Sequence, residues 1–370
     1  MEKKTYKRNA KAMIYLTACA LNARTPDSEK LKTLDMNELF EVCQGHILTA
    51  CTAYALESAG IFDHNFTQAK EKAIRKNILF DAERNNILKR LESENIWYMP
   101  LKGSLLKDWY PKLGMRQMSD NDILYDGSKR EQIRDIMLDM GFTCEHFGES
   151  KDDAYSKQPV FNFEMHNELF DVSQIGKLNE YYRDVKNRLI KDEDNACGYH
   201  FRIEDFYIYL IAHEYKHFTS GGTGVRSLAD TYVLLKKFGD TMDKDYLTAE
   251  LEKLGIADYE KQSRELAMKV FGREQLSDAD KKLLDYYIFS GSYGTLENCA
   301  ENDIERYGQG SKLRFILHRL FPPMNVIKTW YPFFYRHKWL IPVLLICRPF
   351  KGIFTNGTKI KKELHTLFKK

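Results

Sequence analysis

The sequence has few cysteines and no motif that would pair them. The seven cysteines are scattered, their number is odd, and no C-x-x-C occurs. This argues against a disulfide framework and against a cysteine zinc site, and it favours a reducing, cytoplasmic setting. Proline (9 residues) and glycine (21 residues) are also sparse in a chain of 370 residues, so long disordered segments are not expected.

Long hydrophobic runs are missing as well. The longest, WLIPVLLIC at residues 339–347, has nine residues and contains a proline. A helix that spans a bilayer needs about 20 apolar residues, so no transmembrane span is predicted. The start of the chain is basic and then partly apolar, but Thr17 and Asn22 interrupt the apolar run. This pattern favours an amphipathic helix over a signal peptide.

Acidic residues are nearly absent from the C-terminal segment. Residues 311–370 carry 13 Lys or Arg and one acid, Glu363, whereas residues 1–310 carry 43 basic and 52 acidic residues. A basic segment on an acidic body predicts an anionic partner, either a membrane surface or RNA. Membrane contact would place the protein at the inner membrane surface. The alternative is that the apolar residues of this segment pack on the helical part of the chain while its bases face water.

Hydrophobic periodicity divides the chain into four parts. Residues 1–95 have apolar residues at helical spacing and predict an N-terminal helical region. Short aromatic and alternating runs predict an α/β core at residues 96–174, with strands in IWYMPL, NDILYD, FTCEHF and PVFNFEMH. Helical patterns return in a domain at residues 175–310, and the basic aromatic segment at 311–370 follows. The fold class is therefore α+β.

Two carboxylates lie close together in the α/β core. Asp120 and Asp122 stand at i and i+2 at the start of a predicted strand, so both side chains point to the same side. Two carboxylates held together repel each other, and oxygen ligands of this kind suit a hard divalent cation such as magnesium. Glu164, on the polar face of the later strand, is a candidate third metal ligand or general base. Phosphoryl and nucleotidyl transfer commonly use two such ions.

A phosphate-binding pattern precedes the aspartates. Gly103 and Ser104 follow a predicted strand and open a helix, where a phosphate can approach the backbone closely. Lys102 and Arg116 are candidates to contact the same phosphates, the lysine as a point charge and the arginine as a clamp. The alternative is a structural one, in which the aspartates cap a turn and the glycine ends a strand.

The order of these motifs resembles the DNA polymerase beta-like nucleotidyltransferase superfamily. More narrowly, LKGSLLKDWYP, the arginine, SDNDIL, FEMH and HEYKH…VRSLAD are similar to the bacterial family of uncharacterised nucleotidyltransferases, over about residues 80–240. Asn121 stands where an apolar residue is usual between the aspartates.

The resemblance implies a polymerase-like palm that takes two magnesium ions and a nucleoside triphosphate. Asp120, Asp122 and Glu164 would hold metal, and Gly103 and Ser104 would hold triphosphate. The implied reaction transfers a nucleoside monophosphate to an acceptor hydroxyl and releases pyrophosphate. Neither the acceptor nor the base preference follows from the sequence.

Two other functions stay open at this point. One is a nucleotide-binding or interaction module with weak or no catalysis. The other is a zinc peptidase, because HEYKH at residues 213–217 matches H-E-x-x-H and places His213 and His217 one helical turn apart. Glu250 and Glu252 are candidate third ligands for that zinc.

The glycine-rich stretches SGGTG (220–224) and GSYGT (291–295) follow no clear strand, which favours helix–helix turns over phosphate loops.

Overall fold

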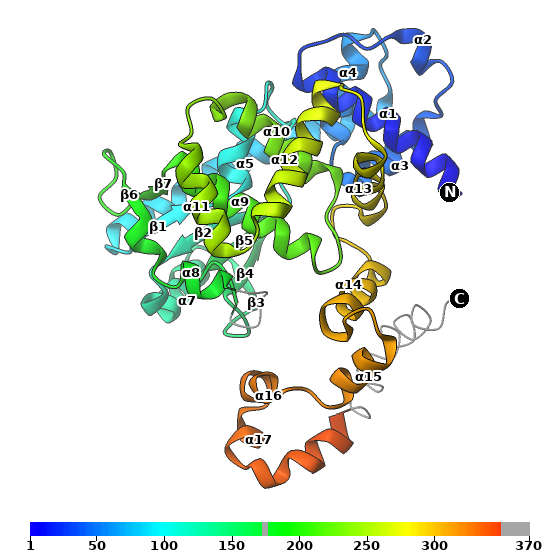
Figure 1. Ribbon diagram of the computed structural model, residues 1–370. Coiled ribbons are helices and arrows are strands. Elements are labelled where there is room, and N and C mark those ends of the chain that lie inside the picture. Colours follow the sequence, from blue (N-terminus) through cyan, green and yellow to red (C-terminus); the bar gives the residue numbers. More distant parts are fainter. Residues whose placement is uncertain (172–176, 349–370) are drawn as a thin grey trace. The chain divides into compact units, whose positions relative to one another are not determined.

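A computed structural model describes residues 1–171 and 177–348 (Figure 1). It has the predicted α+β architecture, with a small mixed sheet between N-terminal and C-terminal helical parts of the sequence. The chain divides into two compact units, residues 1–213 with 225–288, and residues 214–224 with those after 288. The predicted boundary at residues 174 and 175 and the end of the basic segment, residues 349–370, lie outside the described residues.

Helices make up most of residues 1–95. The stretch rich in helix formers is one continuous helix, which starts after Asp63, whose side chain accepts a hydrogen bond from the backbone N–H of Phe66. The helices are α1 (Lys3–Leu21), α2 (Ser28–Leu31), α3 (Met36–His46), α4 (Thr49–Ser58) and α5 (His64–Ser93).

The core sheet has five strands in the order β1-β2-β5-β4-β3. β2 and β5 run parallel, and the other neighbours pair antiparallel. The strands are β1 (Tyr98–Pro100), β2 (Asn121–Tyr125), β3 (Thr143–His146), β4 (Asp152–Lys157) and β5 (Phe161–His166). Two short helices lie within this region, α6 (Gly103–Leu106) and α7 (Arg130–Asp139).

One face of the sheet forms the hydrophobic core of this region. Ile123, Tyr155, Phe163 and Met165 are each fully buried and pack with Ile87 and Leu91 of α5 and Ile133, Ile136 and Met137 of α7. Because side chains alternate along a strand, the residues between these apolar positions point to the opposite face. That opposite face carries Asp122 of β2, Asp152 of β4, and Glu164 and His166 of β5.

Helices dominate again after the sheet. α12 packs against both α1 and α10, so the last part of this unit lies against its first helix (Figure 1). The elements of this part are α8 (Leu178–Tyr182), β6 (Leu189–Lys191), β7 (Tyr199–Phe201), α9 (Ile203–Phe218), α10 (Val225–Phe238), α11 (Lys244–Leu254), α12 (Ala257–Gly272) and α13 (Asp278–Ser290).

The two glycine-rich stretches are helix–helix turns, as predicted. SGGTG separates α9 from α10, and GSYGT separates α13 from α14. The turns touch each other, because the backbone N–H of Thr295 donates to the carbonyl oxygen of Gly221 at 2.7 Å. A Cβ on Gly294 would lie 2.4 Å from that same oxygen, so this contact requires glycine.

The second unit continues with α14 (Leu296–Gly308), α15 (Lys312–Leu320), α16 (Met324–Trp330) and α17 (Pro332–Arg336). Phe315 packs on Ile304, whereas Leu313, Leu317 and Phe321 are exposed. No helix in the described part of the chain is both long and apolar enough to cross a bilayer.

His46 gives the fold a pH dependence. The ring is fully buried at the end of α3, with Nε2 3.2 Å from the Tyr6 hydroxyl, and Nδ1 accepts from the backbone N–H of Val225 at 3.3 Å. Burial lowers its pKa to about 4, so the ring stays neutral in the folded protein at a pH where the unfolded chain binds a proton. The free energy of unfolding is therefore expected to fall by about 2 kcal/mol between pH 7.5 and pH 5.

Urea unfolding at the two pH values tests this dependence. A His46→Gln variant is expected to be less stable at pH 7.5 but to lose this part of the pH dependence. Equal changes with pH in the wild type and the variant would contradict the assignment to His46.

Candidate functional site

The predicted carboxylates lie on two neighbouring parallel strands. In the β2–β5 pair, Asp122 is opposite Glu164 and Leu124 is opposite His166. Register partners point to the same face of a sheet, so Asp122, Glu164 and His166 share the face that is turned away from the hydrophobic core. The parallel register thus brings together residues that are 42 and more positions apart in the sequence.

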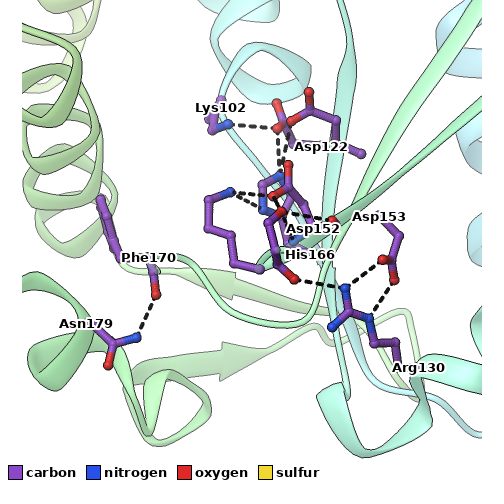
Figure 2. Close-up of polar contacts among 11 residues, drawn as sticks. Lys102, Asp122, Arg130, Asp152, Asp153, His166, Phe170 and Asn179 are labelled. Carbon is purple, nitrogen blue, oxygen red and sulfur yellow. Dashed lines mark hydrogen bonds and ion pairs between the residues drawn. The ribbon is translucent and has the colours of Figure 1, made fainter. Parts of the chain in front are cut away.

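These three side chains form a compact cluster. His166 Nε2 lies 2.8 Å from Asp122 Oδ1 (Figure 2). The same nitrogen lies 3.6 Å from Glu164 Oε2. One ligand atom from each residue lies within 4.8 Å of the other two. The side chains of Asp122 and His166 are only 4% and 1% exposed, whereas that of Glu164 is 30% exposed. Glu164 is therefore the member that solvent, or a substrate, can reach.

Lys102 is the cation closest to Asp122. Its Nζ lies 2.7 Å from Asp122 Oδ1 (Figure 2). Burial opposes the charge on both groups, but their attraction prevails, so the pKa of Lys102 is raised and the pKa of Asp122 is held well below its usual range. His166 also lowers the pKa of Asp122. Asp122 is thus fully ionised in a buried position.

The backbone at Lys102 is strained. Its φ of 49° and ψ of −116° match the first central position of a type II′ turn, which glycine usually occupies. The turn closes with a hydrogen bond from the N–H of Ser104 to the carbonyl of Leu101 at 3.3 Å. A non-glycine residue in such a conformation costs about 1–3 kcal/mol, and such strain is concentrated at functional sites. The turn aims the Lys102 side chain at Asp122.

Asp120 lies one residue before β2 and is half-buried. Burial raises its pKa, and the charges of Asp122 and Glu164 raise it further, although Lys102 and Arg226 partly offset this. The structure therefore brings all three predicted carboxylates within electrostatic reach of one another. Their mutual repulsion is the condition that a bound cation relieves.

Two further lysines surround the cluster. Lys151 Nζ lies 3.0 Å from Nδ1 of His166 and 3.4 Å from Oδ1 of Asp152. Burial, with a contribution from Lys102, lowers the pKa of Lys151. Lys76 of α5 donates to the carbonyl oxygen of Ser119 at 2.9 Å. The site thus combines several cations with its carboxylates, a composition suited to a polyanionic ligand.

Arg116 is buried and bonded to the protein itself. Its Nε donates to Asp230 Oδ1 at 2.7 Å and its Nη1 donates to the carbonyl of Gln117 at 2.7 Å. The hydroxyl of Tyr110 donates to the same Asp230 oxygen at 2.7 Å. Asp230 itself is only 4% exposed, so the ion pair that it forms with Arg116 is buried.

The glycine-serine pair lies beside Arg116. A Cβ on Gly103 would lie 2.8 Å from Met118 Sδ and 3.5 Å from Arg116 Nη1, so the backbone approaches these side chains closely. The Ser104 hydroxyl is buried and donates to the carbonyl of Leu101 at 2.7 Å. In this structure the hydroxyl stabilises the turn that carries Lys102.

No site role was predicted for His166, Lys151 or Asp230, although His166 and Asp230 lie within the motifs FEMH and VRSLAD. A signal existed for His166, because the alternation in FNFEMH places it on the same face as Glu164. No local signal marks Lys151 or Asp230, whose partners lie 15 and 114 positions away.

Within the described residues, the H-E-x-x-H stretch belongs to no group of potential metal ligands. Across residues 1–171 and 177–348, Asp122, Glu164 and His166 form the only group of three or more acidic, histidine or cysteine side chains close enough to share an ion. Glu250, a candidate third ligand, instead accepts hydrogen bonds from Tyr181 at 2.5 Å and Arg188 at 2.9 Å. The zinc peptidase hypothesis therefore lacks its third ligand among the described residues.

Comparison with known proteins gave one match. The model of a family described as uncharacterised nucleotidyltransferase matches residues 32–272, which include the whole sheet and its cluster. No curated protein and no solved structure matched.

Proposed function

The chain belongs to the family of uncharacterised nucleotidyltransferases, and on that premise we propose that it moves a nucleoside monophosphate from a nucleoside triphosphate to an acceptor hydroxyl. The observation that carries this proposal is the pairing of Asp122 with Glu164 on adjacent parallel strands, with Lys102 Nζ 2.7 Å from Asp122. Carboxylates and a cation on one face of a sheet match the requirements of phosphoryl chemistry.

The carboxylates fit divalent cations. Asp120, Asp122 and Glu164 offer hard oxygen ligands, and burial together with the charges of Asp122 and Glu164 raises the pKa of Asp120, which supports a site where a cation would relieve crowded negative charge. We propose that these three residues hold two magnesium ions. When bound, such ions neutralise charge on the phosphates and on the attacking oxygen.

The protein's own residues would act on both sides of the reacting phosphorus. Lys102 and Arg116, with the backbone at Gly103 and Ser104, would bind the β- and γ-phosphates of the donor. Glu164, the more exposed carboxylate, would accept the proton of the acceptor hydroxyl. The bond from the acceptor oxygen to the α-phosphorus forms as the bond to pyrophosphate breaks, so pyrophosphate leaves with the electron pair.

A screen for pyrophosphate release tests the proposal. The full-length protein would be incubated with each nucleoside triphosphate and with acceptors from four classes: sugars, antibiotics, proteins and RNA ends. Release is expected only with magnesium and an acceptor, and a chelator is expected to abolish it, because the carboxylates then repel the triphosphate.

Two outcomes would count against transfer. Magnesium-dependent binding of a labelled triphosphate without any pyrophosphate release would favour the alternative of a nucleotide-binding module. Absence of both binding and release would contradict the role of the site.

A further inference from the structure

A chain of three buried polar groups runs behind the carboxylate cluster. Lys151 Nζ lies 3.0 Å from His166 Nδ1, and His166 Nε2 lies 2.8 Å from Asp122 Oδ1. Figure 2 shows the His166 ring next to Asp122. The three side chains are 9%, 1% and 4% exposed. Groups as buried as these hold their hydrogen-bond directions, because little water is present to replace a lost partner.

The position of Lys151 is fixed by the end of β5. Its backbone carbonyl accepts from the N–H of Asn167 at 2.9 Å and from the N–H of Glu168 at 3.4 Å. Its ammonium also faces Asp152 Oδ1 at 3.4 Å. The backbone therefore ties Lys151 to the strand that carries His166.

Lys151 decides which nitrogen of His166 carries the proton. An ammonium has donors only, so Nδ1 must be the acceptor in this contact. A neutral imidazole then carries its proton on Nε2. Two carboxylates face that atom, Asp122 at 2.8 Å and Glu164 at 3.6 Å, which favours the same tautomer. In this state Nε2 donates to Asp122 and has no lone pair to offer a metal ion.

We propose that Lys151 is a positioning residue that keeps His166 as a hydrogen-bond donor to Asp122, so that the cation site presents carboxylate oxygens only. Oxygen ligands favour hard cations such as magnesium, whereas an imidazole nitrogen favours zinc. Without Lys151, Nε2 becomes free to ligate and the site gains affinity for zinc relative to magnesium. This inference concerns the cation site of the proposed function and rests on it.

Two measurements on the full-length, metal-stripped protein test the inference. The first is the nitrogen-15 spectrum of labelled histidine, with the His166 signals identified by their loss in His166→Gln. The wild type is expected to show a protonated Nε2 and an unprotonated Nδ1. This measurement does not depend on whether any Lys151 variant folds.

The second measurement is calorimetric titration with magnesium and with zinc. In Lys151→Met, the ratio of zinc affinity to magnesium affinity is expected to rise about 10- to 100-fold, the size of effect that partners of metal-site residues usually have. Lys151→Arg is the matched control, because a guanidinium is also a donor only, and its ratio is expected to stay near that of the wild type. A merely structural role for Lys151 would weaken both metals alike.

A protonated Nδ1 in the wild type would overturn the inference, and so would an unchanged affinity ratio in a folded Lys151→Met variant. Neither measurement needs a nucleotide or an acceptor. If the tautomer and the metal preference are as expected but no pyrophosphate release is found with any acceptor, the proposed transfer fails while the assignment of Lys151 stands.

Discussion

Replacing Asp122 with asparagine is expected to lower the rate of nucleotidyl transfer on the order of 10³-fold or more. Asp122 Oδ1 is the atom on which Lys102 and His166 converge, at 2.7 and 2.8 Å, next to Glu164 in the register of the sheet. Asparagine keeps the shape and one acceptor oxygen but removes the charge. Pyrophosphate release with saturating nucleotide measures the effect.

The fold is expected to survive this substitution. The amide oxygen of asparagine can still accept from Lys102 and His166, and circular dichroism should show an unchanged helical signal. Asp126→Asn is the matched control, since Asp126 directly follows the same strand and its side chain accepts from the backbone N–H and the hydroxyl of the exposed Ser128. The control is expected to keep its activity. Full activity in Asp122→Asn would contradict the role of Asp122 in the reaction.

Replacing Asp230 with alanine is expected to destabilise the protein by about 3–5 kcal/mol. The change leaves the guanidinium of Arg116 buried without its carboxylate and deprives the Tyr110 hydroxyl of its acceptor. Arg226, whose pKa is lowered by burial and by the nearby charge of Arg116, would then face Arg116 without the intervening negative charge. Urea unfolding at neutral pH gives the free energy directly.

An exposed aspartate provides the comparison. Asp278 pairs with Lys281 at 2.9 Å with side chains 93% and 61% exposed, so Asp278→Ala is expected to change stability by less than about 1 kcal/mol. The double variant Arg116→Met with Asp230→Leu should recover part of the loss, because it removes both charges together. A loss below about 1 kcal/mol in Asp230→Ala would show that Arg116 finds another partner, such as a bound anion.

The sequence was most informative where periodicity and burial agree. β5 is apolar at alternate positions, which predicts both the strand and the face on which Glu164 lies, and β2 ends in the short apolar run Ile123–Tyr125, which predicts a buried strand. The opposition of Asp122 and Glu164 depends on parallel pairing. Sequence alone reached it only through the resemblance to a known fold.

Other elements left no comparable signal. β4 reads DDAYSK, a polar stretch whose only large apolar side chain is Tyr155, and it is a strand because it pairs with β5 along its whole length. Tertiary pairing overrides weak local preference in such cases. Arg116 was predicted to contact phosphate because it precedes the aspartates. Its ion pair with Asp230 comes from a helix more than a hundred residues later, which no local pattern reveals.

At Lys102 the residue that would relax the turn differs from the residue that the ion pair with Asp122 requires. Glycine would adopt a φ of 49° without steric penalty and would relax this turn. It would also withdraw the ammonium that keeps Asp122 ionised within the sheet. A redesign for thermostability that optimises each turn separately would therefore select Lys102→Gly, although this substitution removes the cation beside Asp122. Lys102 is thus a residue to keep unchanged in such a redesign.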